Sequence, residues 1–126
     1  MSNTPRLKSF APQLLVDDLD RATAFYRDVL GFSFGEPWGG FYAIGVRDGF
    51  AVHLKCAPKT PEDRANRQQN DHLDAYADVA GISALYDACQ AKGVTVLKPL
   101  DRTSWGTLDF YIEDPDGYIL AFGEQS

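Results

Sequence analysis

The stretch from Tyr111 to Phe122, YIEDPDGYILAF, has the pattern of two strands folded about a tight turn. In the turn itself, DPDG at 114–117, proline presets the φ of the second turn residue and glycine supplies the positive φ needed to re-enter a strand. These features predict a β-hairpin. Acidic residues are common in such turns for backbone reasons, so we interpret the turn as scaffold and not as a cation site.

The composition predicts one soluble, cytoplasmic domain spanning 1–126. The chain is 44% hydrophobic, which is enough for one sizeable core, and it holds no run of 18 apolar residues and no apolar leader. Its formal net charge of -6 argues against nucleic acid or an anionic membrane as a partner, because both require a basic surface. A cationic ligand is compatible with this charge. Cys56 and Cys89 are expected to be reduced packing residues.

Two helices with the same pattern divide the chain into halves. The first is expected to begin after Asp18 as N-cap and to end at Gly31, and the second runs over 81–93 and ends at Gly93. Tyr26 and Tyr86 are 60 residues apart, and the two terminal glycines are 62 residues apart. The chain therefore repeats at about half its length, which indicates a duplicated structural unit.

Each helix is preceded by one strand pattern and followed by three. The expected strands are 13–16, 32–35, 41–46 and 50–56 in the first half, and 72–77, 94–98, 107–112 and 118–123 in the second. The predicted fold is therefore α+β with two βαβββ units, at about 8–56 and 72–124, joined by a polar loop at 57–71. A ferredoxin-like βαββαβ chain is disfavoured because it has too few strands.

Two motifs in this order resemble the vicinal oxygen chelate superfamily, which holds glyoxalase I, bleomycin resistance proteins, fosfomycin-modifying enzymes and extradiol dioxygenases. They are VDDLDRATAFYRDVLGF at 16–32 and WGTLDFYIEDPDGYILAF at 105–122. The entry APQL at 11–14 is closest to the bleomycin-resistance-like branch. The resemblance implies that the two units curl into half-barrels forming an open cup whose concave face holds the ligand. It does not define the activity, because one scaffold hosts many chemistries.

Alternation along the strands indicates which residues face the cup. Leu108, Phe110 and Ile112 are apolar and would pack on a helix, so Asp109 and Tyr111 would face the other way. By the same alternation we expect the following further residues on the concave face: Ala51, His53, Lys55, His72, Asp74, Tyr76, Thr107, Ile119 and Ala121.

The resemblance also implies four metal-ligand positions, and these fall on Ala11, His53, His72 and Ala121. Two of the four are methyl groups, and the position usually held by a glutamate is Ala121. Two imidazoles do not supply the three or four protein ligands of a tight metal centre. We therefore expect no cofactor; a divalent metal is the disfavoured alternative, with His53 and His72 as its only, weak candidate ligands. The alanine would instead leave room for a bulkier ligand.

A set of polar and aromatic residues is predicted to line the cup. Each has an alternative: the histidines could be ordinary hydrogen-bonded strand residues, the carboxylates could pair with Lys55 or Arg102, and the tryptophans could pack strand connections. The predicted ligand-binding residues are Gln13, Trp38, His53, His72, Asp74, Trp105, Asp109 and Tyr111.

Two functions follow as hypotheses, and the sequence leaves open whether the protein is an enzyme. The first is a small-molecule-binding protein similar to the bleomycin resistance proteins, which sequester a drug; here the ligand would be planar or cationic and no catalytic metal would be needed. The alternative is a metal-dependent lyase, thiol transferase or dioxygenase with a rearranged site on His53 and His72. The resemblance also implies a homodimer in which half-barrels pair across a two-fold axis.

Overall fold

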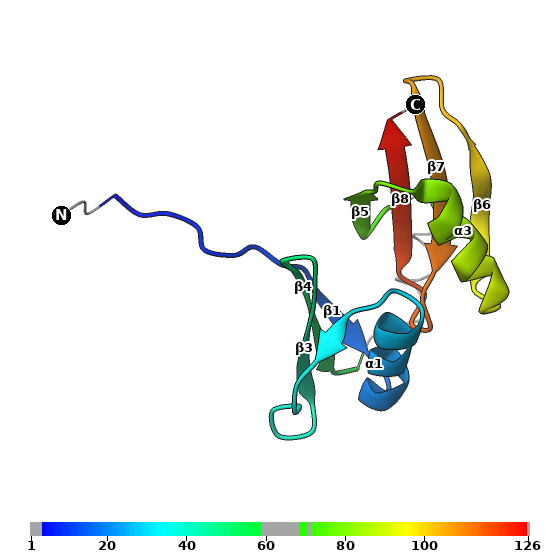
Figure 1. The fold of residues 1–126 in the computed structure, drawn as a ribbon. Coiled ribbons are helices and arrows are strands. Elements are labelled where there is room, and N and C mark those ends of the chain that lie inside the picture. The colour runs from blue at the N-terminus through cyan, green and yellow to red at the C-terminus, as the bar shows by residue number, and fades with distance from the viewer. Residues whose placement is uncertain (1–3, 59–68, 71, 126) are drawn as a thin grey trace.

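The computed structural model describes residues 4–58, 69, 70 and 72–125, and these residues form the same unit twice (Figure 1). The first unit contains β1 (Gln13–Val16), α1 (Leu19–Asp28), β2 (Ser33–Phe34), β3 (Tyr42–Arg47) and β4 (Phe50–Cys56). The second contains β5 (Ala75–Asp78), α3 (Ile82–Ala91), β6 (Thr95–Arg102), β7 (Thr107–Glu113) and β8 (Ile119–Gln125). The predicted α+β fold with two βαβββ units is confirmed, and most of the expected loop at 57–71 lies outside the described residues.

The two sheets have equivalent strand orders. The first sheet runs β1-β4-β3-β2 and the second runs β5-β8-β7-β6. In each sheet the first strand pairs in parallel with the last, while the other pairings are antiparallel. The hairpin predicted from YIEDPDGYILAF is the β7–β8 pair, in register from Thr107 opposite Gln125 to Glu113 opposite Ile119.

The two helices begin in different ways. Asp18 caps α1 as expected, because its side chain accepts a hydrogen bond from the Arg21 amide, and Gly31 follows the helix with a φ of 74°. The N-cap of α3 is Gly81, which has no side chain to do this. Instead the Glu124 carboxylate, which comes from β8, accepts from the amides of Gly81 and Ile82, both at 3.1 Å. The second cap is therefore supplied by a residue remote in sequence.

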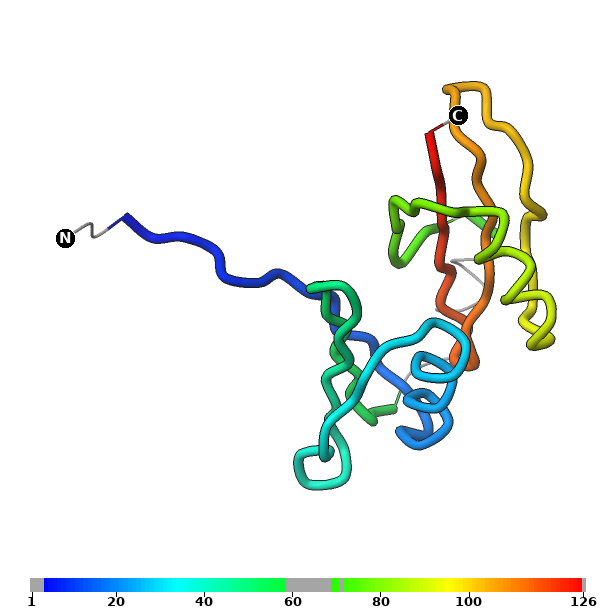
Figure 2. The backbone as a smooth tube through the Cα atoms, in the orientation of Figure 1, coloured from blue at the N-terminus to red at the C-terminus, as the bar shows by residue number. Residues whose placement is uncertain are grey.

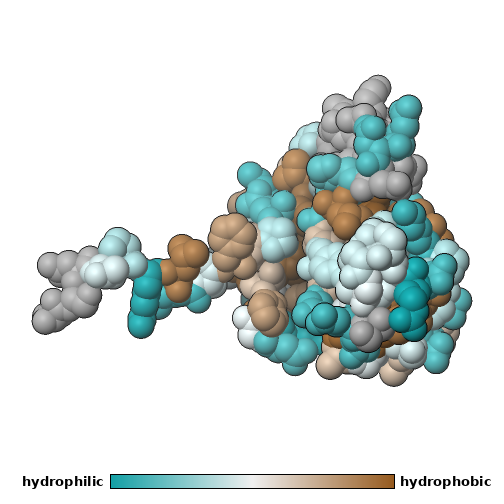
Figure 3. Space-filling view, turned by 90° about the horizontal axis from the view of Figure 1, so that it is seen from above, coloured by the Kyte–Doolittle hydropathy of each residue, from teal (hydrophilic) through white to brown (hydrophobic). Residues whose placement is uncertain are grey.

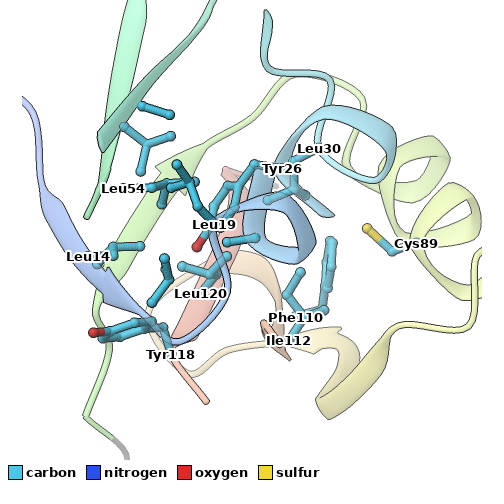
Figure 4. Packing of buried hydrophobic residues seen from close by; sticks show 14 of the residues in the cluster. Leu14, Leu19, Tyr26, Leu30, Leu54, Cys89, Phe110, Ile112, Tyr118 and Leu120 are labelled. Atoms are coloured by element: carbon cyan, nitrogen blue, oxygen red, sulfur yellow. The ribbon is translucent and has the colours of Figure 1, made fainter. Parts of the chain in front are cut away.

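The hydrophobic core lies between each helix and its sheet, and residues of both halves belong to one cluster (Figure 4). Phe110 and Ile112 are fully buried, as alternation predicts. Phe110 packs edge-on against Tyr86 and stacks on Phe122, with ring centroids 5.0 and 5.2 Å away. Ile119 and Ala121 are also buried but do not belong to this cluster, which agrees with their placement on the opposite face of β8.

The turn at 114–117 also joins the two halves. Asp114 Oδ1 accepts from the amides of Asp116 and Tyr118, and its Oδ2 accepts from the Tyr26 hydroxyl of α1 at 2.6 Å. Asp116 Oδ1 accepts from the Asp17 amide and from the Arg21 guanidinium. The turn is therefore scaffold, as predicted, and its carboxylates also hold the second unit against α1.

Tyr118 makes a further link between the halves at the free edge of β1. Its hydroxyl accepts from the Leu15 amide at 2.9 Å and donates to the Leu15 carbonyl at 2.7 Å. Unpaired edge groups of this kind are sites for unwanted strand pairing. One tyrosine side chain thus satisfies both backbone groups that Leu15 turns away from β4.

Residues 4–12, which precede β1, extend away from the body, as the tube in Figure 2 and the space-filling view in Figure 3 show. Leu7 and Phe10 in this arm are 83% and 89% exposed. No helix in the described part of the chain has both the length and the apolar character needed to cross a membrane.

The start of β5 differs from the prediction. A strand was expected over 72–77, but β5 begins at Ala75 and ends at Asp78. The Asp74 carboxylate accepts from the Ile119 amide at 2.8 Å, so its side chain is bonded to the backbone of β8 just before the strand begins. His72 and Asp74 therefore precede β5, the strand whose alternation was used to predict which way their side chains point.

Candidate functional site

The face of the first sheet opposite the core, predicted to line the cup, carries Gln13 and His53 side by side. Leu14, Val16, Val52 and Leu54 are buried in the core, so their strand neighbours point to the opposite face. Gln13 and His53 are opposite one another in the parallel β1–β4 pairing. Their predicted common facing agrees with this register.

A chain of hydrogen bonds connects these two residues through Tyr42. The Gln13 side-chain amide donates to Tyr42 Oη at 2.9 Å, and Tyr42 Oη lies 2.7 Å from His53 Nδ1. The phenol oxygen has lone pairs and one proton, so Tyr42 can donate to Nδ1 or accept from Nδ1–H, depending on the tautomer of His53. In either case Nε2 is the ring nitrogen left for a ligand, as an N–H donor in the first tautomer and as an acceptor in the second.

Tyr42 was missed by the sequence analysis, although it lies in the expected strand 41–46. It pairs with Lys55 in the β3–β4 register and therefore shares a face with His53, two residues earlier in β4. Its ring also contacts Trp38 edge-on at a centroid distance of 6.3 Å. Applying alternation to 41–46 would have placed Tyr42 on the cup face, but only the register shows its bond to His53.

On the second sheet, Asp109 lies on the face opposite the core, which is predicted to line the cup. This residue is only 6% exposed, and its Oδ1 accepts from the Tyr76 hydroxyl at 3.3 Å. Partial desolvation, followed by the charge of Asp109 and their hydrogen bond, raises the pKa of Tyr76, so the phenol stays protonated as the donor. No ion pair joins Asp109 to Lys55 or Arg102 within the described residues, so that alternative for Asp109 does not hold.

Gly123 provides the space in which Tyr76 and Asp109 meet. A Cβ atom added at Gly123 would lie 1.9 Å from Tyr76 Oη and 2.4 Å from Asp109 Oδ1. Both distances are shorter than any non-bonded contact, so a larger residue would force these side chains apart. Alternation placed Tyr76 toward the cup but it was not among the predicted ligand-binding residues, and Gly123 was not predicted at all. No local pattern in the sequence indicates their contact.

Ala121 lies on the floor of this face. It is 1% exposed and stands opposite Tyr76 in β5 and opposite Tyr111 in β7. Lys98 extends over the Tyr111 ring, with Nζ 4.9 Å from the centroid, in a cation–π contact. The predicted cup residues Asp109 and Tyr111 thus border a buried methyl group flanked by two tyrosines.

The remaining predicted residues lie at the margins. His72 Nε2 is 4.0 Å from Asp74 Oδ1, and the imidazole side chain is 60% exposed while that of Asp74 is nearly buried. Trp38 and Trp105 occupy the β2–β3 and β6–β7 connections, which are equivalent places, and both are mostly exposed. They are therefore available to a ligand, and neither is a core residue.

The donor set does not fit a tight metal centre within one chain. The four positions implied by the resemblance hold two methyl groups and two imidazoles. Across residues 4–58, 69–70 and 72–125, no cluster of three or more His, Cys, Asp or Glu side chains could hold a metal ion. The arrangement instead offers hydrogen-bond donors, one buried carboxylate and exposed aromatic rings.

Comparison with known proteins agrees with this fold. The model of the family described as "Glyoxalase/Bleomycin resistance protein/Dioxygenase superfamily" matches residues 6–122. A protein named lactoylglutathione lyase from Haemophilus influenzae is 31% identical over 123 residues, covering 88% of this chain and 87% of the relative.

Solved structures extend the similarity to three dimensions. A glyoxalase-related enzyme from Clostridium phytofermentans superimposes with a TM-score of 0.76 at 18% identity, covering 99% of this chain and 100% of that one. A lactoylglutathione lyase from Agrobacterium tumefaciens has a TM-score of 0.68 at 23% identity, with coverage of 94% and 95%. At these identities the two structures establish the shared fold alone.

Proposed function

The chain belongs to the glyoxalase/bleomycin resistance protein/dioxygenase superfamily, and on that basis we propose that it binds a planar or cationic small molecule without a catalytic metal. The ligand would lie against the concave faces of the sheets, as in a protein that sequesters its ligand. This proposal makes the chain a binding protein, similar in role to the bleomycin resistance branch of the superfamily.

The observation that carries the proposal is the buried methyl group of Ala121. It occupies the last-strand position at which the metal-dependent members are expected to place a carboxylate, and it stands between Tyr76 and Tyr111. A methyl group provides neither a lone pair nor a negative charge for a divalent cation. It does leave an apolar floor bordered by aromatic rings, which suits a flat organic ligand.

The surrounding polar groups support the same proposal. His53 would offer Nε2 to a polar group of the ligand, since Tyr42 holds its Nδ1. Trp38 and Trp105 would stack on the ligand, because exposed indoles lose little rotamer freedom on binding. A few placed polar groups on a mostly apolar concave surface are typical of small-molecule sites.

A second candidate function is a metal-dependent lyase. It is favoured by the 31% identical relative named lactoylglutathione lyase. Such an enzyme would use His53 and His72 as metal ligands. It would need further ligands from elsewhere, because the other two ligand positions implied by the resemblance are alanines. It ranks second because the two remaining family positions, Ala11 and Ala121, are methyl groups that cannot bind a metal.

We propose further that the protein is a homodimer, with His53 of one subunit facing the partner's His72 across a shared cup. Within the described residues, the helix–sheet and strand–strand contacts lie inside each half, while the turn at 114–117 and Tyr118 join the halves. Exposed Leu7, Phe10 and Phe50 add apolar area that a second copy would bury. Sedimentation at micromolar concentration is expected to give the dimer mass, and a monomer there would contradict this arrangement.

Replacing Ala121 by glutamate tests the binding function against the metal function. The unmutated protein, purified without a histidine tag, is expected to carry no stoichiometric transition metal. The Ala121→Glu variant restores one carboxylate ligand and should bind Zn²⁺ at least about tenfold more tightly by calorimetry. Binding of a planar probe, 2-(2-naphthyl)ethylamine, should weaken because the glutamate fills the floor between the tyrosines.

Ala88→Glu is the matched control, because it adds the same carboxylate to the exposed surface of α3. It should change neither zinc affinity nor probe binding. Equimolar zinc, nickel or manganese in the unmutated protein, lost on His72→Ala, would overturn the binding function and place the metalloenzyme first.

A further inference from the structure

The buried carboxylate of Asp109 has one acceptor atom that nothing satisfies. Its Oδ2 is shielded from solvent and has no hydrogen-bond partner within the described residues, while Oδ1 receives only the 3.3 Å bond from Tyr76. A carboxylate normally accepts several hydrogen bonds, and burying it without them costs free energy. This atom therefore marks a place where a donor is missing.

The charges around Asp109 make a cation the missing donor. Asp101 stands directly opposite Asp109 in the β6–β7 pairing, so a second carboxylate lies beside the first on the sheet. Like charges placed opposite one another on a sheet are destabilising. Lys98, on the same strand, is directed at the Tyr111 ring. A positively charged ligand group would relieve both the repulsion and the unsatisfied acceptor.

Tyr76 is the side chain bonded to the other oxygen of this carboxylate. It lies on β5, the edge strand of its sheet, and is 50% exposed, with its hydroxyl seated over Gly123 against Asp109. Its hydroxyl bond to Asp109 is long, and a half-exposed side chain on an edge strand has solvent to rotate into. Rotation of Tyr76 would free Oδ1 without a change in the backbone.

We propose that Asp109 is the subsite for a protonated amine on the ligand and that Tyr76 is a cover displaced by that amine. The inference rests on the proposed binding function, and it narrows the ligand class from planar or cationic to aromatic compounds that carry an ammonium group. The amine would donate to Oδ2, and the released Tyr76 ring would border the ligand above Ala121.

A matched pair of probes tests the subsite: 2-(2-naphthyl)ethylamine, which is protonated at neutral pH, and 2-(2-naphthyl)ethanol, which has the same shape and no charge. The unmutated protein should bind the amine at least about tenfold more tightly than it binds the alcohol, as measured by calorimetry. In Asp109→Asn, which keeps the side-chain shape, that ratio should fall to about one through weaker binding of the amine.

Two further variants separate the subsite from general electrostatics. Asp101→Asn removes the charge of the exposed residue paired with Asp109, and it should lower the ratio by no more than about twofold, because an exposed charge attracts the amine much less than the buried one does. Tyr76→Phe removes the hydroxyl that competes for Oδ1, so amine binding should be retained or tightened. A loss of amine binding in Tyr76→Phe would show that the phenol is the partner and would overturn the proposal.

The failures of the two proposals are distinguishable. If the protein binds both probes equally and Asp109→Asn changes neither affinity, the amine subsite is wrong while the binding function stands. If neither probe binds, the binding function fails and the subsite fails with it. If Asp109→Asn instead weakens self-association without affecting the probe ratio, the missing donor is a basic side chain of a second copy, and the ligand subsite is wrong.

Discussion

Replacing Asp114 by alanine is expected to lower the free energy of unfolding by about 3 kcal/mol, since three hydrogen bonds to one buried carboxylate are lost at about 1 kcal/mol each. The Tyr26 hydroxyl and the amides of Asp116 and Tyr118 all donate to this residue. Because the Tyr26 bond joins α1 to the β7–β8 turn, the loss should also loosen the contact between the halves. Urea unfolding followed by circular dichroism measures the change.

Asp87→Ala provides the control, because Asp87 is an exposed carboxylate on α3. Its removal should alter stability by less than about 0.5 kcal/mol. An equal effect of the two substitutions would show that the turn does not bind the halves together as the structure indicates.

The same carboxylate makes stability depend on pH in a defined direction. Burial raises the pKa of Asp114 above its ordinary value of 3.8, with its hydrogen bonds opposing this shift. The folded state therefore binds this proton more tightly than the unfolded state. The stabilisation that results is present at low pH and is lost as pH rises through the pKa of Asp114 in the folded state. The stability difference between the unmutated protein and Asp114→Asn should grow as pH is lowered from 7 toward 4. If the stability difference shrinks as pH is lowered, the pKa of Asp114 is lowered in the folded state and not raised.

Phe110→Ala is expected to cost about 4 kcal/mol, the usual loss for removing a fully buried phenylalanine ring. The ring lies between Tyr86 of α3 and Phe122 of β8, so its removal leaves a cavity where helix and sheet meet. Tyr86 and Phe122 are large side chains on a helix and a strand, so they can move only partly into the cavity. Thermal or urea unfolding of the variant gives the loss directly.

Phe50→Ala removes the same side chain from an exposed site at the start of β4. It should cost the monomer less than about 1 kcal/mol. A small effect of Phe110→Ala, comparable with that of Phe50→Ala, would contradict the placement of Phe110 in the core. Asp109 and Tyr111 flank Phe110 on the opposite face, so a loosened β7 should also reduce binding of the naphthyl probes.

Local sequence patterns were sufficient to predict the helices and strands and their order along the chain. Asp18 marks the start of α1 and Gly31 follows its end. Both could be predicted, because a cap and a left-handed residue act on the backbone beside them. Alternation placed Phe110 and Ile112 in the core and Asp109 on the other face, since successive strand residues point to opposite sides. The DPDG turn, the half-length repeat and the alanine at 121 are likewise visible in the sequence without any tertiary information.

The partners of the polar side chains were decided by the tertiary structure. Glu124 caps α3, Tyr42 bonds His53 and Tyr118 closes the edge of β1, and none of these contacts lies within a local window of sequence. The late start of β5 has the same origin, because Asp74 bonds to the Ile119 amide of β8. Strand register and the packing of one half on the other determine which side chains meet, and periodicity carries no information about either. For that reason the sequence could place Asp109 on the cup face, but only the fold brings Tyr76 over Gly123 to bond with it.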